Sequence, residues 1–250
     1  MKNAFSSSIA AMLGLIVLWQ LIVSLTDVPR FILPSPYLVG ISFIENFDLI
    51  GEHTLVTLNE ILLGLVIGIT LGIITALQFE ISSAAKFFLK PVLIFSQAIP
   101  VFALAPVLTL WLGYGMISKV TMAVLIIYFP VTSALHDGLT RTPSGFSDLA
   151  HVMNSKPMRF LFLIRLPAAM PNLLSGIRLA AVYAPIGAVI GEWVGASKGL
   201  GYLMLYASGR VQIDLMFSAI IILAIFTLLL YSLTSYITKE LTKWDPKSNL

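Results

Sequence analysis

Six continuous apolar segments constrain the fold more than any other feature of this chain. They cover residues 8–25, 57–77, 91–112, 118–135, 173–194 and 215–237. A helix that crosses a bilayer needs about 20 predominantly apolar residues. Charged residues make up only 11% of the chain, whereas a soluble domain carries about 25%. The sequence therefore predicts an all-α membrane protein with about six transmembrane helices.

The segments suggest a simple division of the chain. We expect an N-terminal anchor helix and a proline-rich outer segment in residues 1–50, a transmembrane domain in 51–240, and a short tail in 241–250. The first apolar segment is interpreted as a retained anchor, because it is long and no A-x-A cleavage pattern follows it. Residues 41–50 are expected to form a short surface helix.

The basic residues assign an orientation to the predicted spans. Six spans place both termini on one side, and cytoplasmic loops carry an excess of Lys and Arg. If that side is the cytoplasm, the inner set has ten residues and the outer set four, with Arg178 left uncounted. The inner set is Lys2, Lys86, Lys90, Arg141, Lys156, Arg159, Arg165, Lys239, Lys243 and Lys247; the outer set is Arg30, Lys119, Lys198 and Arg210. The sequence thus predicts cytoplasmic termini.

Sequence patterns that would carry chemistry are missing. The chain has no cysteine, which excludes disulfides and thiolate metal sites. No G-x-x-x-x-G-K-[ST] string is present, so the chain cannot bind ATP through a P-loop. His53, His136 and His151 are too far apart for a metal-binding helix pair. We therefore expect neither an enzyme nor a cofactor or metal site in this chain, and no basic face suggests nucleic acid.

Prolines within three consecutive spans favour a pathway between bent helices. Pro100, Pro106, Pro130 and Pro185 each free a backbone carbonyl that a neighbour or water must satisfy. The alternative is ordinary, because proline is frequent in membrane helices. The pathway candidates are Gln97, Pro100, Tyr128, Tyr183 and Glu192.

Glu192 is interpreted as the one carboxylate within or at the edge of a span. A charge at the bilayer centre is costly, so the side chain faces protein, water or the outer interface. Trp193 beside it is typical of an interfacial anchor. Both a place at the interface and a role on the substrate path remain open. Gly64, Gly68 and Gly72 share one helix face and favour close packing, either within the chain or between subunits.

A long polar loop of residues 137–171 separates the fourth and fifth spans. Connections in helical bundles usually have about 2–8 residues, so this loop is large enough for structure of its own. Leu149, Val152 and Met153 share a face at helical spacing from a helix expected to begin at Asp148. Lys156-Pro157 then interrupts, and Pro157 suits the first turn of a second helix. The second helix is expected to end at residues 166–167, with re-entry into the membrane after residue 171.

The spacing within this loop matches a known motif. Residues 164–167 read I-R-L-P, Asn154 lies ten residues before them, and residues 148–150 read D-L-A. This resembles the EAA loop of the permease subunits of binding-protein-dependent ABC importers: E-A-A, three residues, Gly, nine residues, I-x-L-P. Aspartate replaces glutamate, leucine replaces one alanine, and asparagine replaces glycine. Asparagine is the residue besides glycine that best tolerates the left-handed conformation of a sharp helix stop.

The resemblance extends over roughly residues 50–240. Residues 96–115 (SQAIPVFALAPVLTLWLGYG), 186–195 (IGAVIGEWVG) and 199–204 (GLGYLM) are similar to permeases of the nitrate, sulfonate, taurine and thiamine-pyrimidine branch. Residues 129–139 (FPVTSALHDGL) and 215–217 (LMF) look most like the permease of the hydroxymethylpyrimidine (thiamine precursor) system.

The resemblance implies a fold, partners and a location. It implies a type I ABC importer permease in the bacterial plasma (inner) membrane, with two permease copies forming the pathway. Two partner ATPase subunits bind ATP and magnesium, and an extracytoplasmic binding protein delivers the solute. The implied coupling residues are Asp148, Ala150, Asn154, Arg159, Ile164, Leu166 and Pro167.

Three alternatives remain at the level of the sequence. A secondary transporter is disfavoured because Glu192 has no ionisable partner in the predicted spans. A membrane-embedded enzyme is disfavoured because no His, Asp or Glu residues converge at one depth. A structural or assembly subunit is the alternative that the sequence excludes least well.

Overall fold

The computed structural model describes the backbone of residues 2–244 and the side-chain environment of residues 10–244. This part of the chain is helical and contains no strand. Its elements are α1 (Lys2–Thr26), α2 (Pro36–Glu45), α3 (Phe47–Ile81), α4 (Ser83–Ala98), α5 (Val101–Leu112), α6 (Met116–Thr140), α7 (Ser144–Val152), α8 (Pro157–Phe160), a π-helical turn η1 (Leu161–Arg165), α9 (Leu166–Trp193), α10 (Leu200–Gly209) and α11 (Ile213–Leu241). Of the predicted tail, residues 245–250 lie outside the described residues.

The long helices account for most of the predicted spans. Within the described residues, α3, α6, α11 and the continuous helix Pro157–Trp193 are long and apolar enough to cross a membrane. Helices α4 and α5 pass the same test only as a pair, bent by 106°. The apolar part of α1, Ala10–Thr26, is shorter. The chain is therefore a multi-pass membrane protein.

The bend between α4 and α5 lies at one of the two predicted prolines. Pro100 occupies the N-cap position of α5, whereas Pro106 lies inside that helix. A proline just before or at the start of a helix costs no intrahelical hydrogen bond, which explains why the chain turns at Pro100. The sequence indicates a break of residues 91–112 at both prolines, but Pro106 stays within α5, so this part of the prediction is wrong.

Helices α3, α6 and α9 form the core of the fold, and glycines set their spacing. A Cβ atom on Gly64, Gly68 or Gly72 of α3 would lie within 3 Å of α6 side chains. On the other side of α6, a Cβ on Gly187 of α9 would lie 2.6 Å from the Ala123 Cα. Small residues let membrane helices approach closely. The Gly64–Gly72 face thus serves packing within the chain.

The outer segment differs from the prediction for residues 41–50. Its helix, α2, begins at Pro36 because the Ser35 hydroxyl caps it by accepting the Leu38 N–H at 3.3 Å. The helix ends at Glu45. Ser and Pro at these two positions favour a helix start. Residues 47–50 belong to the first turn of α3.

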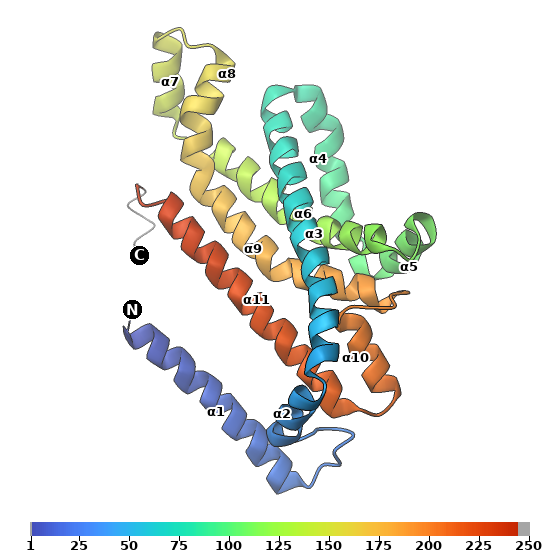
Figure 1. Cartoon of the computed structure of the whole chain (residues 1–250). Helices are drawn as coiled ribbons and strands as arrows, with labels where there is room; N and C mark the ends of the chain where they lie inside the picture. The colour runs from blue at the N-terminus through green and yellow to red at the C-terminus, as the bar shows by residue number, and fades with distance from the viewer. Residues whose placement is uncertain (1, 245–250) are drawn as a thin grey trace.

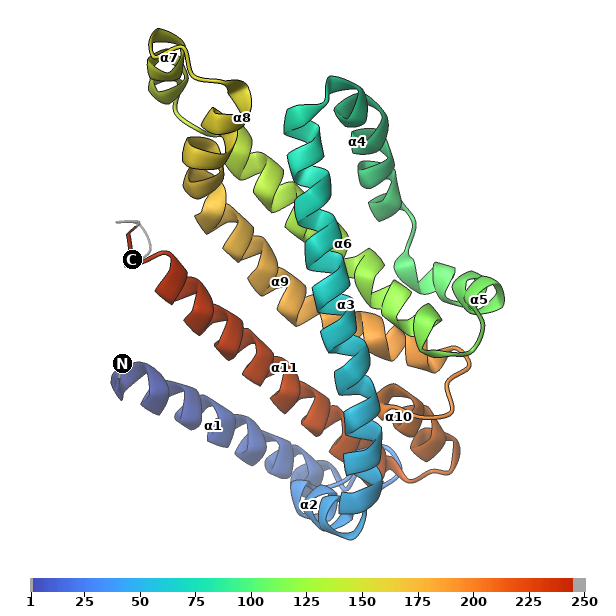
Figure 2. The same cartoon turned by 45° about the horizontal axis from the view of Figure 1, so that its top comes forward.

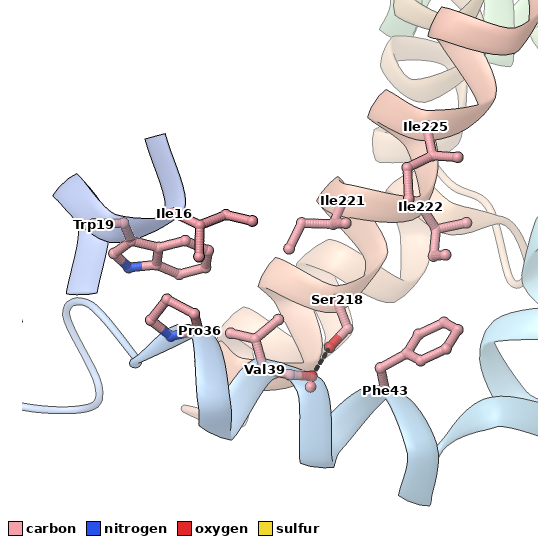
Figure 3. A pocket seen from close by; sticks show the side chains of 10 residues that line it. Ile16, Trp19, Pro36, Val39, Phe43, Ser218, Ile221, Ile222 and Ile225 are labelled. Atoms are coloured by element: carbon pink, nitrogen blue, oxygen red, sulfur yellow. Dashed lines mark hydrogen bonds between the residues drawn. The ribbon is translucent and has the colours of Figure 1, made fainter. Parts of the chain in front are cut away.

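Helix α1 lies apart from the core and meets it mainly through α2. Figure 3 shows the apolar groove of about 300 Å³ between α1, α2 and α11, where the Ser218 hydroxyl donates to the Val39 carbonyl at 3.0 Å. The side chains around it include Ile16, Trp19 and Ile225. The groove is far from the loop that carries α7, which projects at the other end of the molecule (Figure 1).

Candidate functional site: the α7–α8 loop and the clusters along the spans

The loop between α6 and α9 folds as a helix, a sharp turn and a second helix. Helix α7 and the short α8 project beyond the ends of the spanning helices (Figures 1 and 2). Helix α7 begins at Ser144, so Asp148 lies in its second turn rather than at its start. The prediction for Asp148 missed Pro143, which supplies the extended residue before the helix. The loop thus contains the two helices that the sequence predicts, joined by a sharp turn.

The turn after α7 explains the spacing between Ala150 and Asn154. Asn154 has φ +49°, the left-handed conformation expected from the sequence. Its N–H donates to the His151 carbonyl at 3.0 Å, and the Ser155 N–H donates to the Ala150 carbonyl at 2.9 Å. These two bonds, with a left-handed residue between them, define a Schellman motif. Ala150 and Asn154 therefore belong to the same Schellman motif, which ends α7 and sets the direction of α8.

Helix α7 presents apolar side chains to the surroundings. Phe146, Leu149 and Met153 follow the i, i+3, i+7 spacing of one helix face, and they are 47%, 52% and 71% exposed. Val152 beside them is 86% exposed, whereas Ala150 is buried. An exposed apolar patch outside the spans is typical of a docking site for another protein. Arg159 on α8 is also exposed.

The second helix of the loop does not end at residues 166–167. It passes through η1, where the Leu166 N–H bonds to the Leu161 carbonyl, and continues as α9. Pro167 lies in the first turn of α9 and Pro171 within it. A π-helical turn is one of the ways in which a helix accommodates a local disruption. Ile164, Leu166 and Pro167 therefore lie on the helix that crosses the membrane, and they connect the loop directly to the span.

Two of the five pathway candidates share a pocket. Gln97 and Tyr183 line a pocket of about 520 Å³ between α4, α5, α6 and α9, together with Phe129, Ser133 and Asp137. Its lining also includes Pro130 and Ile126, the residue whose carbonyl Pro130 leaves without its intrahelical donor. Freed backbone groups in a membrane protein are tolerated where they line a cavity.

The other three candidates lie elsewhere. Pro100 caps α5 at the bend and does not line this pocket. The Tyr128 hydroxyl donates to Thr75 Oγ1 at 2.9 Å, between α6 and α3. Glu192 belongs to a separate buried cluster at the opposite end of the spans from α7.

Glu192 is enclosed by protein rather than placed at an interface. Its side chain is 1% exposed. Oε1 accepts a hydrogen bond from the Thr57 hydroxyl at 2.6 Å, and Oε2 accepts one from the Gly201 N–H. Glu60 of α3 is equally buried and lies within hydrogen-bonding reach of Glu192.

The same cluster holds the start of α10. The N–H groups of Gly199, Leu200 and Gly201 donate in turn to His53 Nδ1, Thr57 Oγ1 and Glu192. Gly199 has φ +117°, and a Cβ there would collide with the Glu192 carboxyl group. Glycine is the residue that fits such a conformation. Side chains from α3 and α9 thus replace the missing intrahelical partners at this helix start.

Sequence reasoning missed Glu60 and Lys119. Both lie within predicted spans, so a simple search for charged residues in apolar segments would have found them. The prediction that Glu192 has no ionisable partner is wrong, because Glu60 adjoins it. Lys119 is in α6 rather than an outer loop, and its ammonium donates to the carbonyls of Tyr114 at 2.7 Å and Gly115 at 3.0 Å.

Replacement of Thr57 by valine is expected to loosen this cluster. The change removes the hydroxyl that donates to Glu192 and accepts from Leu200, and it leaves buried polar groups without a partner, at a cost of about 1–3 kcal/mol. The measurement is thermal unfolding of the purified chain in detergent. Thr70→Val is the matched control, because the Thr70 hydroxyl is exposed and bonds only within α3. Equal melting temperatures for the two variants would contradict the importance of this network.

Comparison with known proteins identifies the family. Residues 68–243 match the family described as binding-protein-dependent transport system inner membrane component. A probable ABC transporter permease protein of Haemophilus influenzae is 52% identical over 217 residues, covering 87% of this chain and 89% of that protein. The formylaminopyrimidine transport permease protein ThiX of Halalkalibacterium halodurans is 33% identical over 236 residues, covering 94% of each. The chain belongs to this family of transporter permease components.

A solved structure supports the same fold. A chain from an inward-facing structure of the MetNI methionine ABC transporter superposes with a TM-score of 0.60 at 18% identity, covering 83% of this chain and 98% of that one. At this identity the likeness speaks only for the fold, and it confirms the predicted type I ABC importer permease class. The names of the curated relatives give several different solutes.

Proposed function

We propose that this chain is the membrane-spanning subunit of an ATP-driven importer for a small organic solute. The observation that carries the proposal is the α7–α8 knob: an exposed apolar helix, ended by a Schellman turn at Asn154 and continuous with the spanning helix α9. Such a knob suits the groove of a soluble partner. In the proposal that partner is an ATPase dimer, which binds ATP and magnesium and contacts residues from Asp148 to Pro167.

Two copies of the chain form the pathway in this proposal. The pocket with Gln97 and Tyr183 opens on the face shared by α4, α5, α6 and α9, and a second copy would cover it. An extracytoplasmic binding protein delivers the solute to the end of the molecule that carries α10. The membrane is the bacterial inner membrane, and both termini are cytoplasmic, as the distribution of Lys and Arg favours.

For the solute we propose the thiamine precursor hydroxymethylpyrimidine. The support is the sequence resemblance over residues 129–139 and the similarity to the formylaminopyrimidine permease. The alternative is a sulfonate, taurine or nitrate-like anion. Proteoliposomes that hold the complex and its binding protein are expected to accumulate labelled hydroxymethylpyrimidine, whereas accumulation of taurine alone would select the alternative.

The first test of the function is co-purification of a P-loop ATPase from mild detergent. Leu149→Glu is expected to release the ATPase, because it places a charge in the apolar face of α7 where a partner would have to desolvate it. Ser147→Glu is the matched control, since it adds the same charge on the opposite, polar face of the same helix. Recovery of the unsubstituted chain alone, under conditions that preserve other importer complexes, would contradict the proposal.

A further inference from the structure

A cluster of charged groups links the exit of the α7–α8 loop to two spanning helices. Arg165, the last residue of η1, places Nη1 2.7 Å from Oε2 of Glu80 in the last turn of α3. Its Nη2 and Nε donate to the Leu139 carbonyl of α6 at 2.7 and 3.2 Å. The Glu80 side chain is 9% exposed and that of Arg165 is 23% exposed. This is a largely buried ion pair with a second anchor on a backbone carbonyl.

The groups in this cluster provide one another with hydrogen-bond partners and opposite charges. The Leu139 carbonyl is among the last four of α6, which have no intrahelical donor, and a cation is favourable at a helix C-terminus. His136 Nδ1 lies 3.3 Å from Glu80 Oε1, and neither atom has another hydrogen-bond partner. A proton on His136 Nδ1 would let it donate a hydrogen bond to Glu80 Oε1, so that both atoms have a partner. The ends of α3 and α6 are therefore tied to the loop by Arg165.

The loop has few other connections to the spans. Helix α7 projects away from them (Figure 2) and packs on no other helix extensively, so its movement can reach α6 through residues 141–143, α9 through η1, and α3 through Arg165. From Thr57 to Glu80, α3 is one unbroken stretch of 24 helical residues, about 35 Å long at 1.5 Å per residue. Its other end carries the cluster that holds α10. A displacement applied at Glu80 is thus applied to a helix that reaches the opposite side of the membrane.

We propose that Glu80 is a positioning residue for transport, which passes movement of the α7–α8 loop to α3 by holding Arg165. The proposal rests on the proposed function, and Glu80 lies outside the motif that suggested that function. Removal of one partner of a buried ion pair leaves the other without compensation. Glu80→Gln should therefore free the loop from α3 while α7 and its apolar face stay intact.

The absence of cysteine from this chain allows a direct test. Leu55→Cys, at a 61% exposed position near the outer end of α3, carries a spin label in the complex with its own ATPase. Pulsed electron paramagnetic resonance measures the distance between the labels of the two copies, without nucleotide and after trapping with ATP and vanadate. With Glu80 present, trapping is expected to shift this distance. Glu80→Gln is expected to abolish most of the shift, and Glu80→Asp to restore it.

A second ion pair supplies the control. Glu240 of α11 and Lys243, which follows that helix, are 44% and 66% exposed, so Glu240→Gln removes an exposed pair away from the loop and should keep the full shift. A full shift in Glu80→Gln overturns the inference and leaves the proposed function intact. Failure of the ATPase to co-purify with the unsubstituted chain overturns both. If Glu80→Gln does not fold, Arg165→Gln replaces it, and a full shift in that variant likewise overturns the inference.

Discussion

Asn154→Val is expected to abolish uptake and to make ATP hydrolysis unresponsive to the substrate-loaded binding protein. Asn154 adopts φ +49°, and the left-handed conformation costs an ordinary L-residue about 1–2 kcal/mol. The branched Cβ of valine makes that conformation worse still. The turn is expected to relax, and the bond from the Ser155 N–H to the Ala150 carbonyl is lost with it. Helix α8 then leaves α7 in a different direction.

Asn154→Gly is the matched control for this prediction. Glycine adopts the left-handed conformation without penalty, so the Schellman turn and the direction of α8 are kept. The comparison measures uptake and substrate-stimulated ATPase activity in proteoliposomes, with co-purified ATPase as a check on assembly. Normal stimulation in the valine variant would show that the geometry of this turn does not matter for coupling.

Gly187→Ala is expected to be the most damaging single-methyl change in the core. A Cβ at this position would lie 2.6 Å from the Cα and 3.1 Å from the N of Ala123. Both are backbone atoms of α6, so no side-chain rotation relieves the contact, and α6 and α9 must move apart. Overpacking of this kind costs about 1–3 kcal/mol. The same two helices line the pocket with Gln97 and Tyr183, so uptake is expected to fall together with stability.

Gly51→Ala tests whether the added methyl group or its location causes the loss. Gly51 lies in α3, and nothing would approach a Cβ there within 4 Å. Alanine is favoured over glycine inside a helix by about 0.5–1 kcal/mol, so this variant should be as stable as the unsubstituted chain or slightly more so. Thermal unfolding in detergent compares the two. Similar melting temperatures would mean that α6 and α9 are less tightly packed than described.

The sequence predicts those features of the fold that depend on local chemistry. Apolar length located the long spans, and proline chemistry indicated that residues 91–112 are interrupted, although it did not distinguish Pro100 from Pro106. The left-handed turn at Asn154 was expected from the glycine position of the motif that the loop resembles, together with the tolerance of asparagine for that conformation. Each of these depends on a few neighbouring residues, so a single sequence carries the necessary information.

Features that depend on contacts between distant segments were missed. The pairing of Glu60 with Glu192 joins residues 132 positions apart, so the sequence shows two carboxylates in apolar segments but not that they lie next to each other. The continuation of α8 into α9 through η1 was also missed, because proline usually ends a helix. Pro106 is a further exception to this rule, because it lies inside α5.

The hydrogen bonds from the start of α10 to side chains of α3 and α9 also constrain how this chain can evolve. Residues 196–198 make no side-chain hydrogen bond among those described, whereas the N–H groups of Gly199, Leu200 and Gly201 each have a fixed acceptor. Insertions and substitutions should therefore accumulate in the first stretch across related chains and be purged from the second. His53, Thr57 and Glu192 are expected to be inherited together with the two glycines, so that divergence in this loop stops at Gly199, just before α10.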